Sequence, residues 1–110
     1  MVQNTIDKIE EMIRSNSSLT EKNKKELLDL LLSMKPEIAA LSKTKNEHAE
    51  SIAGFMERST HEVLRQEKNP SLIKIAIDGL KASVKDFELS HPKLSENVYY
   101  IANTLSNMGI

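Results

Sequence analysis

Residues 69–109 read NPSLIKIAIDGLKASVKDFELSHPKLSENVYYIANTLSNMG, and this stretch decides the fold. Apolar side chains recur in it at alternating intervals of four and three residues, the spacing of one face of an α-helix. Asn69 and Pro70 predict where a first helix begins, and Pro92 predicts the start of a second. The stretch therefore predicts an antiparallel helical hairpin closed by ten apolar side chains, namely Ile73, Ile77, Leu80, Val84, Phe87, Leu94, Val98, Ile101, Leu105 and Met108.

The same spacing extends toward the N-terminus and predicts two more helices. The first carries Val2, Ile6, Ile9 and Ile13 on one face, and Thr20 is a suitable N-cap for the second. A stripe in the second helix continues through Pro36, and two further leucines widen it. A helix that is apolar on more than one side is usually buried on more than one side. We therefore expect a second copy of the chain to cover part of this stripe, whose members are Leu27, Leu28, Leu30, Leu31, Leu32, Met34, Ile38 and Leu41.

The middle of the chain, from Glu37 to about Glu67, has no strong stop signal, and two interpretations stay open. It is either one helix about 45 Å long, from a rise of ~1.5 Å per residue, or two helices joined by a turn near residues 43–46. The polar residues 42–51 fit both interpretations. Gly54 and Gly79 lie inside expected helices, where glycine is unfavourable, and we expect both to allow close approach of another helix.

Composition excludes several classes of protein. The 110 residues carry 15 basic and 16 acidic side chains, balanced along the chain, which argues against a general binder of nucleic acid or membrane surfaces. Without cysteine there are no disulfides and no thiolate chemistry. No apolar run approaches the ~20 residues of a membrane span. We expect an all-α, cytoplasmic protein forming a single helical domain over residues 1–110.

Side chains that carry chemistry are few and scattered. Glu57 and His61 lie four residues apart, which is typical of a solvated helix pair and a weak signal for a metal. His48 is either an exposed helix residue or a pH-sensitive contact with a partner. The basic candidates for an anion patch are Lys22, Lys24, Lys25, Lys43 and Lys45. We assign no catalytic, cofactor-binding or metal-binding residue, and we expect no enzyme.

Residues 87–94, with the sequence FELSHPKL, and residues 104–110, with the sequence TLSNMGI, support a resemblance. Together with the leucine-rich residues 27–32, they resemble a family of short bacterial helical proteins that is known only as a domain of unknown function. The resemblance covers roughly the last forty residues. It implies a bacterial cytoplasmic protein and supplies no activity, substrate or site residue.

These patterns predict antiparallel helical hairpins with coiled-coil-like packing, in four or five helices including one long central helix, assembled into an oligomeric bundle. The leading functional hypothesis is a non-enzymatic module that self-associates, most simply as a dimer, and contacts a protein partner. The alternative is a small regulator that binds nucleic acid weakly through its lysines. The residues predicted to bind a partner are Leu27, Leu30, Leu31, Met34, Ile38, Ile52, Phe55 and Tyr100.

Overall fold

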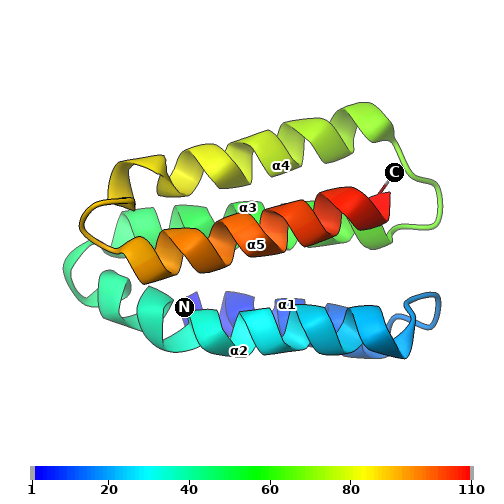
Figure 1. The fold of residues 1–110 in the computed structure, drawn as a ribbon, viewed down its shortest axis with the longest axis horizontal. Coiled ribbons are helices and arrows are strands. Elements are labelled where there is room, and N and C mark those ends of the chain that lie inside the picture. The colour runs from blue at the N-terminus through cyan, green and yellow to red at the C-terminus, as the bar shows by residue number, and fades with distance from the viewer. Residues whose placement is uncertain (1, 110) are drawn as a thin grey trace.

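A computed structural model describes residues 2–109, and these residues form helices joined by short turns, with no strand among them (Figure 1). The all-α prediction is confirmed. A single 3-10 turn, η1 (Lys85–Phe87), follows the fourth helix. The five α-helices are α1 (Val2–Ser15), α2 (Glu21–Thr44), α3 (Asn46–Leu64), α4 (Pro70–Val84) and α5 (Pro92–Gly109).

Side chains at the helix starts act as the sequence predicts. The Thr20 Oγ1 accepts a hydrogen bond from the Asn23 backbone N–H at 3.1 Å, which satisfies one of the free amides at the start of α2. The Asn69 Oδ1 accepts from the Leu72 N–H at 3.1 Å and does the same for α4. Proline is the first residue of both α4 and α5, where no amide donor is needed.

The long polar middle of the chain is broken at Lys45. The backbone of Lys45 has φ −137° and ψ 63°, which is not helical, so α2 ends at Thr44 and α3 begins at Asn46. The interpretation with a turn near residues 43–46 is confirmed, and that of one helix over residues 37–67 is wrong. The long helix is instead α2, which passes through Pro36 without ending.

The helices stack in three tiers, with α3 in the middle (Figure 1). The hairpin of α1 and α2 lies on one side, α4 lies on the other, and α3 and α5 lie between them. Helix α3 packs against all four other α-helices, whereas α1 packs against α2 and α3. The bundle measures 37 × 25 × 21 Å. The α-helices alternate in direction, so α1 starts away from the end of the bundle at which α5 finishes, although its start lies well inside the opposite end (Figure 1).

The core is aliphatic, as the low aromatic content requires. All four apolar residues on the predicted face of α1 are buried, and Phe87 is the one buried aromatic side chain among residues 2–109. The predicted α4–α5 hairpin is confirmed. Nine of its ten apolar side chains are buried, and the tenth, Met108, is half-buried against the core.

Candidate interaction surface

The eight side chains predicted to bind a partner fall into two groups. Leu30 is half-buried against the core, while Phe55 and Tyr100 are 42% and 58% exposed. The other five are at most 2% exposed in the single chain, so this fold withholds them from a partner. They are Leu27, Leu31, Met34, Ile38 and Ile52.

The wide apolar stripe of α2 is largely covered within the single chain. Helix α2 packs against α1, α3 and α5 of the same chain, so three neighbours supply the cover that we expected from a second copy. Only Leu32, which is 54% exposed, remains open on α2 among its large apolar side chains. The partner-binding prediction is therefore carried forward for Phe55 and Tyr100.

The side chain of Phe55, which belongs to α3, packs against α4 at Gly79. A Cβ atom on Gly79 would lie 2.5 Å from Cε1 and 2.7 Å from Cδ1 of the Phe55 ring, so only glycine leaves the ring this position. The prediction of close approach at Gly79 is thus confirmed. At Gly54 the same prediction is wrong, because no atom lies within 4 Å of the place where its Cβ would be.

A second apolar stripe runs along α4 beneath this ring. Its residues are three or four apart, and therefore share one side of the helix. Ile75 is 67% exposed, and Ala82 is also exposed, whereas Leu72 and Gly79 are half-buried. Together they form one exposed face, which we name the α3–α4 surface and define as Phe55, Leu72, Ile75, Gly79 and Ala82.

A buried carboxylate lies on the same side of α3 as Phe55. Ser59 and Glu62 follow Phe55 at intervals of four and three residues, and they are 0% and 1% exposed. Because α3 and α4 are antiparallel and rise equally per residue, the Phe55–Gly79 contact sets their register. Seven residues after Phe55 on α3 and seven residues before Gly79 on α4, this register places Glu62 opposite Leu72. The carboxylate therefore underlies one end of the α3–α4 surface.

Two arginines hold this carboxylate. The Arg65 Nη1 donates to the Glu62 Oε1 at 2.9 Å, and the Arg58 Nη2 lies 3.4 Å from Oε2. Both arginine side chains remain partly exposed, at 62% for Arg58 and 36% for Arg65, so their charges reach solvent at the rim of the surface. Sequence reasoning missed Glu62, although its spacing from Phe55 and its flanking arginines were visible. A buried ion pair of this kind is weak evidence for stability, because the cost of burying the charge offsets the attraction and the Glu62 Oε2 has no hydrogen-bond partner among the described residues.

Two of the histidines contact the same aromatic ring. His48, in the first turn of α3, packs edge to face on the Phe87 ring, with 5.2 Å between the ring centroids. His91 packs edge to face on the same ring, with 6.0 Å between the centroids. His48 is exposed. The predicted Glu57–His61 pair is replaced by an ion pair between α3 and α1, because the Glu57 Oε2 lies 3.4 Å from the Lys8 Nζ. No three potential metal-binding side chains cluster anywhere in residues 2–109.

The lysines do not form one patch. Lys25 and Lys43 are near opposite ends of α2, about 27 Å apart at ~1.5 Å per residue. The Lys25 ammonium pairs with Asp29 at 2.8 Å, and the Lys24 ammonium donates to the Arg14 carbonyl at 3.2 Å. The predicted basic cluster is thus divided, and two of its members are engaged within the chain.

Fold and surface define a class: a small all-α bundle with an exposed apolar face on two neighbouring helices. The sequence model of the family described as "Domain of unknown function (DUF4404)" matches residues 39–110, and the chain belongs to this family. The resemblance drawn from the C-terminal residues is thereby confirmed, and the matched range contains the whole α3–α4 surface. No curated protein and no solved structure matches the chain. Within residues 2–109, every helix is too short or too polar to cross a membrane.

Proposed function

We propose that the chain is a non-enzymatic protein-interaction module that forms a homodimer through the α3–α4 surface. The observation that carries this proposal is the Phe55 ring lying on Gly79, with the exposed Ile75 beside it on α4. Two large apolar side chains on adjacent helices make a continuous apolar patch, and such patches mark association sites when they are exposed. Scattered single apolar residues, such as Leu89 in the turn before α5, carry no such meaning.

The shape of the stripe favours a second copy as the occupant. A two-fold axis that crosses α4 at right angles near Gly79 would place the two α4 helices antiparallel, with the same patch of both subunits in contact. Ile75 lies four residues before Gly79, and Ala82 lies three residues after it. Each bulky Ile75 would then meet the small Ala82 of the other copy. The Phe55 ring, which covers Gly79, would lie near the axis and pack against the Phe55 ring of the other copy.

The proposal also covers the cellular location of the protein and the kind of organism it comes from. We place the protein in the bacterial cytoplasm, as an oligomeric helical bundle with coiled-coil-like contacts between copies. The absence of cysteine is consistent with a reducing compartment. The alternative, weak nucleic-acid binding through lysines, has less support because those lysines lie at opposite ends of α2.

Sedimentation equilibrium on the wild type and on Ile75→Glu tests the dimer. The wild type should sediment at twice its chain mass of 12.4 kDa, and Ile75→Glu should sediment at the chain mass, because a charge would be buried without a partner. Leu89→Glu is the matched control, since Leu89 is 98% exposed and outside the surface. A wild type that stays monomeric at high concentration, or an Ile75→Glu variant that stays dimeric, would refute the proposal.

A further inference from the structure

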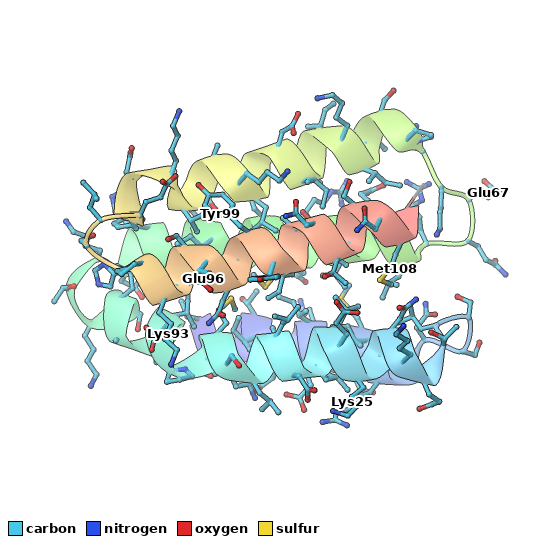
Figure 2. The ribbon with its side chains drawn as sticks, viewed as in Figure 1. Lys25, Glu67, Lys93, Glu96, Tyr99 and Met108 are labelled. Carbon is cyan, nitrogen blue, oxygen red and sulfur yellow. The ribbon has the colours of Figure 1, made fainter. Side chains whose placement is uncertain are left out.

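A second exposed feature lies on α5, away from the α3–α4 surface. A hollow of about 350 Å³ is bordered by the first half of α5 and by the turn that precedes it. Figure 2 shows Glu96 and Tyr99 on this half of the helix. We name the hollow the tyrosine pocket and define it by Glu88, Pro92, Glu96, Tyr99, Tyr100 and Asn103.

The tyrosine pocket carries negative charge without an ion pair among residues 2–109. Neither Glu88 nor Glu96 forms an ion pair within the described residues, and no lysine or arginine lines the hollow. The Tyr99 hydroxyl donates a 2.6 Å hydrogen bond to the Glu88 Oε1, which anchors the turn to α5. This bond raises the pKa of Tyr99 to about 12.

An aromatic ring completes the arrangement. Tyr100 lies four residues after Glu96 on α5, and it is 58% exposed. Its side chain is free of the core contacts that hold the apolar residues of the same helix. A ring face beside carboxylates attracts a cation in two ways, through the ring quadrupole and through charge. Tyrosine is also among the residues that most often dominate binding at protein interfaces.

We infer that the tyrosine pocket binds a lysine or arginine side chain presented by a basic segment of another protein. Charge complementarity selects the basic group, because two carboxylates without an ion pair line the hollow and no lysine or arginine among residues 2–109 lines it. The openness of the site selects a macromolecular partner. Glu88, Glu96 and Tyr100 are all exposed, so a small free cation would keep most of its water, whereas a segment adds contacts along α5.

Fluorescence anisotropy with a labelled octapeptide of alternating lysine and serine tests this inference on the full chain. Binding to the wild type should weaken as salt is raised, because the charges are exposed and screened. Tyr100→Ala should raise the Kd about tenfold or more, the usual loss at a dominant interface residue, whereas Tyr100→Phe keeps the ring and should stay within about twofold. Tyr100 is exposed, so circular dichroism should show the wild-type fold in both variants.

Glu96→Gln and Glu67→Gln form the matched pair for charge. Glu67 is exposed at the opposite end of the molecule (Figure 2), so removing its charge alters net charge equally without touching the pocket. Glu96→Gln should weaken peptide binding about fivefold, about 1 kcal/mol at RT ≈ 0.59 kcal/mol, and Glu67→Gln should leave it unchanged. Equal effects of both variants, or unchanged binding by Tyr100→Ala, would overturn the inference.

A last measurement separates this site from the proposed dimer. Ile75→Glu should lose self-association and still bind the peptide, because Ile75 lies on α4 outside the tyrosine pocket. If Tyr100→Ala instead abolishes self-association while the wild type ignores the peptide, the pocket contacts a second copy of the chain. That result would overturn the inference and leave homodimerisation standing through a different surface.

Discussion

Replacing Gly79 with alanine tests the packing of Phe55 on α4. Alanine is favoured over glycine inside a helix by about 1 kcal/mol, so the change alone should stabilise the protein. At Gly79, however, the new Cβ would lie 2.5 Å from the Phe55 ring, which must swing outward. Forcing an extra methyl group into occupied space typically costs about 1–3 kcal/mol. We therefore expect Gly79→Ala to change the free energy of unfolding by between about 0 and −2 kcal/mol.

Gly54 supplies the matched control, because it lies inside α3 with open space around its Cβ position. Gly54→Ala should stabilise the chain by about 1 kcal/mol, the propensity gain alone. Removing the ring should restore the same gain at the other site, so that adding Gly79→Ala to Phe55→Ala also stabilises by about 1 kcal/mol. The double-mutant cycle between Phe55 and Gly79 should then give a coupling energy of about 1–3 kcal/mol.

Urea unfolding followed by circular dichroism measures all of these variants. It should be run at low protein concentration, since association of folded chains would raise the apparent stability. The slope with urea should stay constant across the series if only stability changes. Equal stabilisation by Gly79→Ala and Gly54→Ala in the wild-type background would refute the contact, and with it the central element of the α3–α4 surface.

Three further predictions follow from the charged and phenolic groups. Glu62→Leu should destabilise less than Glu62→Ala, by about 1 kcal/mol or more in urea unfolding, because leucine refills the buried volume while the exposed arginines regain water. The Lys35 ammonium lies 2.9 Å from the Glu10 Oε1 and lowers the pKa of Glu10. The stabilisation from this carboxylate is therefore present above its ordinary pKa of 4.5 and is lost as the pH falls through the lower pKa of the folded state. Glu10→Gln should match the wild type in acid and be less stable by about 0.5–1 kcal/mol at neutral pH. Ultraviolet titration of the two tyrosines should show one of them ionising near pH 12, and any stabilisation from the Tyr99–Glu88 bond should be lost between pH 10 and 12; a Tyr99→Phe variant that still shows the late ionisation would contradict the assignment.

The helices themselves could be predicted from the sequence because each has an apolar face with regularly spaced residues. Thr20 and Asn69 also mark helix starts through chemistry that is local to a few residues. The break at Lys45 was less readable, since residues 42–51 contain neither glycine nor proline. There the turn places the buried Leu41 and Ala49 of two successive helices in one core, a tertiary requirement that local spacing does not express.

The candidate surface was harder to predict, for a related reason. The spacing of apolar residues in α2 shows how wide its apolar stripe is. It does not show whether helices of this chain or of another chain bury that stripe. Gly54 and Gly79 likewise look alike in sequence, and only the neighbouring helix distinguishes open space from a ring. Glu62 was missed because a charged residue is ordinarily exposed, and its burial depends on how the helices pack around α3.

The placement of the first and last helices has a practical consequence for anything joined to the chain. Because α1 starts well inside the bundle and α5 finishes at one end of it (Figure 1), domains fused before α1 and after α5 would leave the molecule at two separate places. A domain fused after α5 would leave the tyrosine pocket open, because that hollow is bordered by the first half of the same helix.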